Sequence, residues 1–103
     1  MKLLQIDFPF QGPFAEELAQ ACHELAENIA EAPGLHWKIW TEDAATHRAG
    51  GIYLFADQDS AETYLQMHTE RLKEFGVNAV RAYIFDVSLE LFQITRGPIP
   101  TRV

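Results

Sequence analysis

Residues 35–42 read LHWKIWTE and contain both tryptophans of the chain, Trp37 and Trp40. The stretch is rich in aromatic and β-prone residues, follows the helix-stopping pair Pro33-Gly34, and leads into a polar EDAAT segment. These features predict a strand. Because side chains alternate between the two faces of a strand, residues three apart point in opposite directions. The sheet is therefore predicted to carry a large ring on each face.

The spacing of apolar residues predicts the other elements. With residues 35–42, alternation predicts strands and helical spacing predicts helices in the order strand 2–10, helix 13–32, strand 35–42, strand 47–56, helix 59–75 and strand 79–87. The tail from Ser88 is expected to begin with a short strand. The order β-α-β-β-α-β is that of a ferredoxin-like α+β fold, with both helices on one face of an antiparallel sheet. We expect one domain over residues 1–103.

The strands predicted at 47–56 and 79–87 carry large apolar groups on both faces. Helices cover only one face, and an uncovered apolar face forgoes about 25 cal/mol per Å². A second copy packed sheet to sheet is the natural remedy, so we predict a homodimer through the sheet faces. Trp37 lies two residues from Leu35 and from Ile39, so it shares their face of the strand and is predicted to lie in the core. Trp40 falls in a polar row and is predicted to be a pocket wall or, preferably, a dimer contact.

Composition excludes several classes of partner. Fifteen acidic residues against eight basic ones give a net charge of −7, which argues against nucleic acid and anionic membranes. No signal peptide or membrane-spanning run is recognisable, so a cytoplasmic protein is expected. The four histidines and the single cysteine have no metal-ligand spacing, which predicts no metal site. Gly50-Gly51 inside a predicted strand indicates a bulge or a close backbone approach.

Several segments resemble the YdhR-like monooxygenase family. They are APGLHWKIWTE at 32–42, GGIYLFAD at 50–57, SAETYLQMHTERL at 60–72 and the QGPF turn at 11–14. The resemblance extends from about residue 3 to about residue 94 and implies a dimeric α+β barrel. It also implies kinship with antibiotic-biosynthesis monooxygenases, which oxidise hydroquinones, anthrones and similar aromatic compounds with O2 and use no flavin, haem or metal. We therefore expect no cofactor.

The resemblance also directs attention to particular residues. Relatives typically use an Asn on the first strand, a Trp on the third and a His or Tyr near the second helix. The first two positions offer Gln5 and Tyr53 here, so only His68 occupies a familiar place. His68 is predicted to be a catalytic base or hydrogen-bond donor, against the alternative of a core histidine.

Four further residues are predicted to bind substrate. They are Trp40, Tyr53 and Tyr64 as aromatic walls, and Arg71, one turn after His68, as a group that holds an anion at the mouth. An ion pair of Arg71 with Glu70 or Glu74 is the alternative. The alternative for each tyrosine is a purely structural role in packing.

Three functions follow from these observations. The first is cofactor-independent monooxygenation of a small aromatic or quinol-like compound. The second is a non-catalytic dimer that binds a small ligand or serves in a stress response. The third is an isomerase or decarboxylase of a small lactone or aromatic acid, because this scaffold hosts such chemistry elsewhere.

Overall fold

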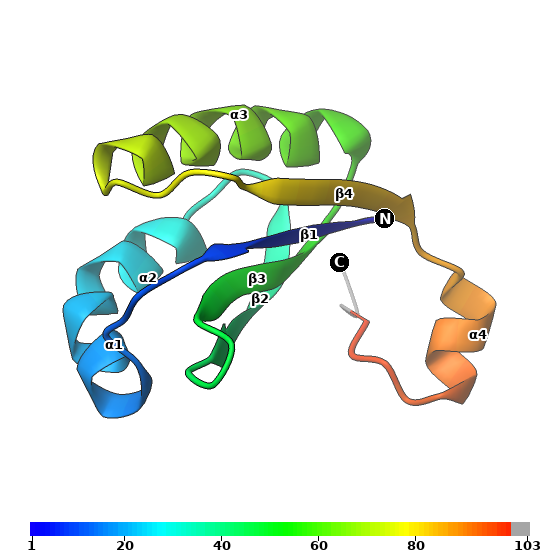
Figure 1. The fold of residues 1–103 in the computed structure, drawn as a ribbon. Coiled ribbons are helices and arrows are strands. Elements are labelled where there is room, and N and C mark those ends of the chain that lie inside the picture. The colour runs from blue at the N-terminus through cyan, green and yellow to red at the C-terminus, as the bar shows by residue number, and fades with distance from the viewer. Residues whose placement is uncertain (100–103) are drawn as a thin grey trace.

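The predicted strands form an antiparallel sheet in the computed structural model, which describes residues 1–99 (Figure 1). Its strand order is β2-β3-β1-β4. The strands are β1 (Lys2–Pro9), β2 (Leu35–Asp43), β3 (Arg48–Phe55) and β4 (Arg81–Asp86). The two β-α-β crossovers put β1 between β3 and β4, as the ferredoxin-like order requires. The prediction of fold class is confirmed.

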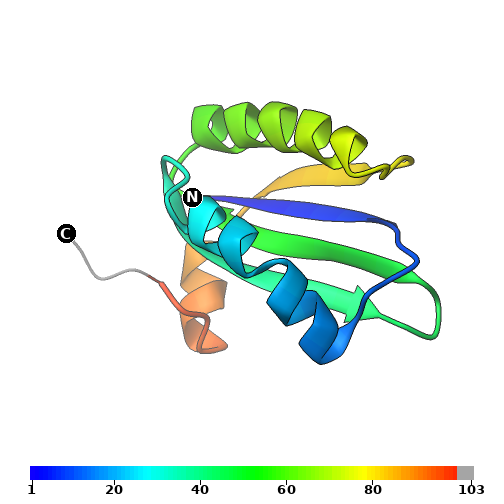
Figure 2. The same ribbon diagram turned by 90° about the vertical axis from the view of Figure 1, so that its left-hand side faces the viewer.

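Three helices cover one face of this sheet: α1 (Ala15–Ala21), α2 (His23–Ala30) and α3 (Gln58–Glu74) (Figures 1 and 2). Helix α3 packs against β1 and β3, and α2 packs against β2. Asp57 caps α3 by accepting a hydrogen bond from the Ser60 backbone N–H at 2.8 Å. Past the other end of α3, Gly76 adopts φ +80°, a conformation that glycine tolerates.

The single helix predicted over residues 13–32 is wrong, because the chain bends at Cys22 between α1 and α2. Hydrogen bonds continue through the bend: the Cys22 N–H donates to the Leu18 carbonyl at 2.9 Å, and the Cys22 carbonyl accepts from Ala26 at 2.8 Å. The bend therefore sacrifices little hydrogen bonding. It allows Leu18 of α1 and Ile29 of α2 both to be buried.

The hydrophobic core lies between this face of the sheet and the helices. The strands contribute alternate residues, as the period of two predicts. The core comprises Leu4, Ile6 and Phe8 of β1, Ala49, Tyr53 and Phe55 of β3, Ile29, Ala61, Tyr64 and Leu72 of the helices, and Val77 after α3.

A β-bulge in β2 corrects the prediction for Trp37. Leu35 pairs with Phe55 and Trp37 pairs with Leu54, so His36 is an extra residue that shifts the alternation. Leu35 packs against the core, whereas Trp37 lies on the opposite, open face, where its indole N–H donates to the Pro98 carbonyl at 3.0 Å. The prediction that Trp37 lies in the core is therefore wrong.

Trp40 lies on the helix-covered face, where it pairs with Gly51. The two tryptophans do point to opposite faces, as predicted, but the preferred interpretation of Trp40 as a contact across the bare face is wrong. Gly50 confirms the close backbone approach, because a Cβ there would lie 2.0 Å from the Ile6 carbonyl oxygen. The bulge itself lies in β2 between Leu35 and Trp37, opposite Leu54 and Phe55 and not at the two glycines.

The short strand predicted for the tail is also wrong, because residues Leu89–Ile94 form a helix, α4. Helical spacing brings Leu91, Phe92 and Thr95 to one side, where they line a hollow together with Leu3 and Leu54 of the open face. Leu54 is 0% exposed. In Figure 1 α4 stands apart from the other helices. The last tail residues, 100–103, lie outside the described part.

Within residues 1–99, no helix is long and apolar enough to cross a bilayer.

Candidate functional site

A cavity of about 280 Å³ lies between the helix-covered face of the sheet and the helices. Its walls are mostly aromatic and aliphatic. They come from β1 and the turn after it (Phe8, Phe10, Pro13), from α1 and α2 (Leu18, Cys22, Leu25), from β2 and β3 (Lys38, Trp40, Tyr53), and from α3 and its end (His68, Leu72, Phe75). Few polar groups enter this space, which is typical of a pocket for a small organic ligand.

Three of the predicted site residues, Trp40, Tyr53 and His68, line this cavity together. Tyr64 lies behind them. Its hydroxyl donates to the Tyr53 hydroxyl at 3.3 Å, and its ring stacks on His68 with centroids 5.0 Å apart. Burial raises the pKa of both tyrosines, so each stays a neutral phenol. Tyr64 therefore positions two cavity residues instead of facing the cavity itself.

His68 is only 3% exposed, and its surroundings determine its protonation state. Arg71 approaches Nδ1 with Nε at 3.2 Å and Nη2 at 2.9 Å. A guanidinium has only donors, so Nδ1 must accept and the ring proton is on Nε2. Burial, reinforced by the charges of Arg71 and Lys38, lowers the pKa of His68 to about 3. At neutral pH His68 is a neutral N–H donor, and this geometry favours the donor role over the role of base.

Arg71 is held behind His68 and does not line the cavity. Besides His68, it binds Asn28 of α2, with Nη1 at 2.8 Å from Oδ1. Glu70, the alternative partner, pairs with Lys73 at 3.3 Å instead. Arg71 thus fixes the ring orientation and tautomer of His68, a task that the sequence did not suggest.

Lys38 also lines the cavity, a position not predicted from the sequence. Its Nζ lies 3.4 Å from the centroid of the Trp40 ring and 4.8 Å from that of Tyr53. Space for the side chain comes from Gly51, where a Cβ would lie 2.6 Å from the Lys38 Cε. Burial lowers the pKa of Lys38 to about 7, with Arg71 acting in the same direction and Cys22 opposing. Lys38 has the parity of Trp40, and that shared parity was the available signal.

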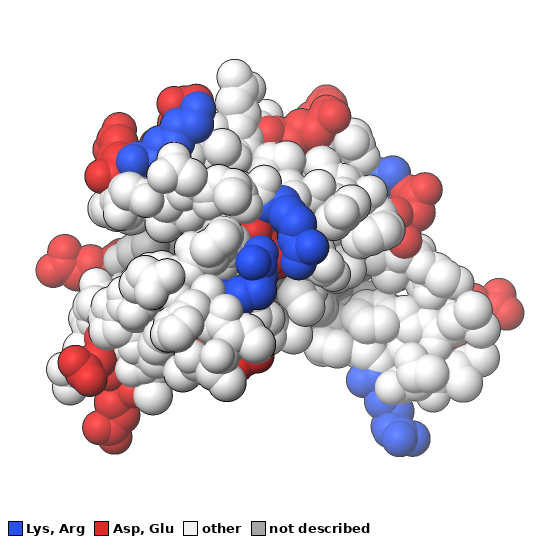
Figure 3. Space-filling model, viewed as in Figure 1, with Lys and Arg blue, Asp and Glu red and all other residues white. Residues whose placement is uncertain are grey.

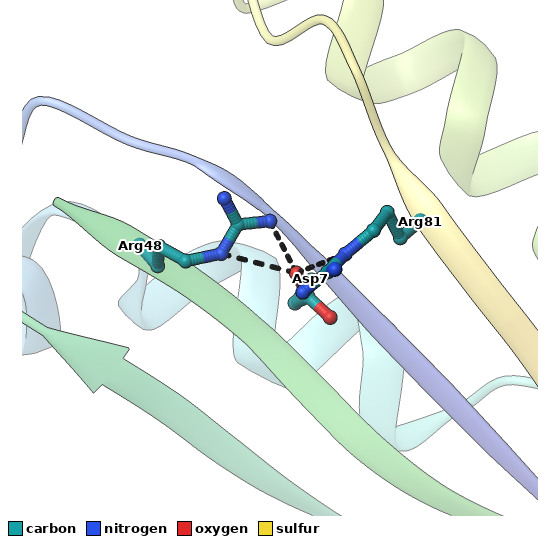
Figure 4. Close-up of polar contacts among 3 residues, drawn as sticks. All are labelled: Asp7, Arg48 and Arg81. Atoms are coloured by element: carbon teal, nitrogen blue, oxygen red, sulfur yellow. Dashed lines mark hydrogen bonds and ion pairs between the residues drawn. The ribbon is translucent and has the colours of Figure 1, made fainter. Parts of the chain in front are cut away.

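A separate charged cluster lies on the open face and joins three strands. Figure 4 shows that Asp7 of β1 lies between Arg48 of β3 and Arg81 of β4. The acidic side chains seen in Figure 3 gather elsewhere, around the helices. Asp7 Oδ1 accepts from Arg48 Nε at 3.1 Å and from Arg81 Nη2 at 2.9 Å. Burial alone would raise the pKa of Asp7, but the two guanidiniums lower it. The cluster is a structural tie across β1, β3 and β4.

Comparisons with known proteins agree with this architecture. The family model described as "Putative mono-oxygenase ydhR" matches residues 3–98. A solved structure described as "a putative antibiotic biosynthesis monooxygenase from Deinococcus radiodurans" superposes with a TM-score of 0.62 at 14% identity, covering 85% of this chain and 93% of that one. At this identity the likeness shows the fold. A comparison with curated proteins found no match. The resemblance in the sequence is thereby confirmed.

Proposed function

The chain belongs to the YdhR mono-oxygenase family, and from this premise we propose that it oxygenates a small aromatic or quinol-like compound with O2. The observation that carries the proposal is the cavity of about 280 Å³, with Trp40 and Tyr53 in its walls and the buried N–H donor of His68. Its volume is near the lower end of ligand pockets, which span roughly 300–1,000 Å³. Such a space suits a flat molecule of one or a few rings.

The chemistry asks little more of the protein. An electron-rich substrate loses a proton, and the resulting anion gives electrons to O2. For an anthrone-type methylene, one oxygen atom becomes the new carbonyl and the other leaves as water, so the carbon supplies all four electrons that O2 takes up. The protein must exclude water, hold the ring flat and stabilise the oxyanion. Aromatic walls and the His68 N–H suit these tasks.

Oxygen uptake by metal-free and flavin-free protein tests the proposal. The substrates are a panel of hydroquinones and anthrones, and His68→Ala is compared with His23→Ala, whose side chain is exposed on α2. Loss of one oxyanion donor typically costs about 10²–10³ in kcat. We expect a loss of that order for His68→Ala and none for His23→Ala.

Other outcomes favour the alternative functions. Saturable binding across the panel without oxygen uptake favours a binding protein. Loss of substrate in the absence of O2 favours an isomerase or decarboxylase. Uptake that His68→Ala leaves unchanged refutes the role of His68.

We also propose that the open face of the sheet packs against a second copy of the chain. Ile39 and Tyr83 are 51% and 52% exposed on that face, and Phe85 stacks beside Tyr83. An apolar surface of this kind supports a sheet-to-sheet homodimer. The double variant Ile39→Lys/Tyr83→Lys should have the light-scattering mass of one chain where the wild type has that of two. A monomeric wild type contradicts the proposal.

A further inference from the structure

We propose that Lys38 is the proton acceptor of the cavity, so that the site selects planar compounds with an ionisable hydroxyl group and holds them as aryloxide anions. Lys38 would be the base of the proposed oxygenase and aryloxides its substrate class, so this inference rests on the proposed function. The binding step itself needs no oxygen and can be tested alone.

The side chain of Lys38 is held in the cavity by its place on β2 and by the residues around it. It lies on the helix-covered face of β2, and its stem passes over Gly51, the place where a Cβ would collide with it. Its Nζ rests on the face of Trp40, beside Tyr53. A planar ligand between these aromatic walls would bring its hydroxyl group to the amine.

The amine has no anionic partner among residues 1–99: no ion pair or side-chain hydrogen bond of Lys38 occurs there. Glu42, two residues after Trp40 on the same face, instead accepts a hydrogen bond from the Ala15 N–H at 2.7 Å. An amine without a counter-ion in an apolar cavity is complementary to a ligand that brings a negative charge.

The groups that face Lys38 divide the remaining tasks. From α3, the neutral His68 presents its N–H, and the Arg71 cation lies behind it. From β3, Tyr53 stays a neutral phenol because burial raises its pKa. Cys22, at the junction of α1 and α2, contributes a thiol to the wall. Neither His68 nor Tyr53 is suited to take a proton at neutral pH, whereas a pKa of about 7 leaves much of Lys38 as the free amine.

The step is a simple proton transfer. The O–H bond of the ligand breaks, an N–H bond forms on Lys38 Nζ, and the products are an aryloxide and an ammonium ion. Both charges appear together inside the cavity and neutralise each other there. The His68 Nε2–H is available as a second donor to the oxyanion. An electron-rich aryloxide is also the species that can give an electron to O2.

Titration with 4-nitrophenol under anaerobic conditions tests the site without reference to oxygenase activity. Its phenolate absorbs at longer wavelength than the phenol, so the spectrum reports the ionisation of the bound ligand. The buffer is set near pH 7, where part of Lys38 is the free amine and part of the ligand in solution is the neutral phenol, and the signal is the phenolate in excess of that present without protein. We expect the wild type to bind it as the phenolate and Lys38→Met to bind phenolate about 10- to 100-fold more weakly.

One variant serves as a control. Lys73→Met removes an exposed lysine that pairs with Glu70. It should keep the phenolate signal, and circular dichroism should show Lys38→Met to be folded. The site is refuted if the wild type does not bind the probe, if it binds the probe only as the neutral phenol, or if Lys38→Met keeps the full signal. A phenolate signal in this titration, together with no oxygen uptake on the panel of hydroquinones and anthrones, would refute the oxygenase and leave the aryloxide site standing.

Discussion

Replacing Lys38 by methionine should stabilise the protein at neutral pH, and this gain should shrink as the pH rises. Methionine keeps the apolar stem that crosses Gly51 and contacts Trp40, but it cannot be charged. In the unfolded chain Lys38 holds its proton up to its ordinary pKa of 10.5, whereas burial in the folded chain lowers the pKa to about 7. Between these values the unfolded state binds more protons, so stability falls as the pH falls through this window.

The magnitude follows from the two pKa values. The drop from 10.5 to about 7 corresponds to about 5 kcal/mol once the pH is well below both values. Between about pH 9.5 and about pH 6, linkage gives a change of about 3 kcal/mol. Because the side chain is partly exposed and its ammonium lies against Trp40, we expect about 2 kcal/mol of this change to appear.

Urea unfolding across that pH range provides the measurement. The difference in free energy of unfolding between Lys38→Met and the wild type cancels the titration of every other group that the two proteins share. It should grow as the pH is lowered towards 7 and then become constant. Lys73→Met, which removes an exposed lysine, should run parallel to the wild type throughout. If Lys38→Met also runs parallel, Lys38 is an ordinary charged lysine and the reasoning is wrong.

Two further perturbations follow from the same contacts. Arg71→Met removes the donor at His68 Nδ1 and a nearby charge, so the pKa of His68 should rise from about 3 but stay below 6.5 because the ring is still buried; NMR titration of the imidazole checks this, and an unchanged pKa would assign the whole effect to burial. Gly50→Ala would put a Cβ 2.0 Å from a backbone oxygen, so this variant should destabilise the fold by more than about 2 kcal/mol in urea unfolding. Gly51→Ala would put a Cβ 2.6 Å from the flexible Lys38 Cε, so this variant should chiefly lose 4-nitrophenol binding. Equal loss of stability in the two alanine variants would contradict this distinction.

The fold could be predicted because most of its determinants are local. Alternation in residues 2–10, 47–56 and 79–87 gave strands in the right order, and helical spacing gave the long α3. Helix α4 was missed because short apolar stretches suit either a strand or a helix, and the hollow that it lines together with Leu54 exists only in the assembled sheet. The bend at Cys22 likewise depends on how the two halves meet the sheet.

The site was predicted less completely, for a different reason. Trp40, Tyr53 and His68 were found through their residue types and the family resemblance, and they do line a common cavity. Lys38 was overlooked because it shares its parity with Trp40 and Glu42, a row that we interpreted as polar and, for Trp40, assigned preferably to a dimer contact. That row instead faces the cavity, where a polar group among rings has a chemical use. Periodicity separates two faces of a strand, but it does not say which face holds a pocket.

The extra residue at His36 decides what the cavity contains. Leu35 is fixed in the core beside Phe55, so an unbroken alternation from Leu35 would turn Trp37 inward and Lys38 outward. The bulge reverses this: Trp37 goes to the open face and Lys38 enters the cavity. An indole at that position would fill the space with a ring, whereas lysine supplies an amine and Gly51 leaves room for its stem. A shift of one residue in the register of β2 thus separates a filled hydrophobic core from a cavity that contains the amine of Lys38.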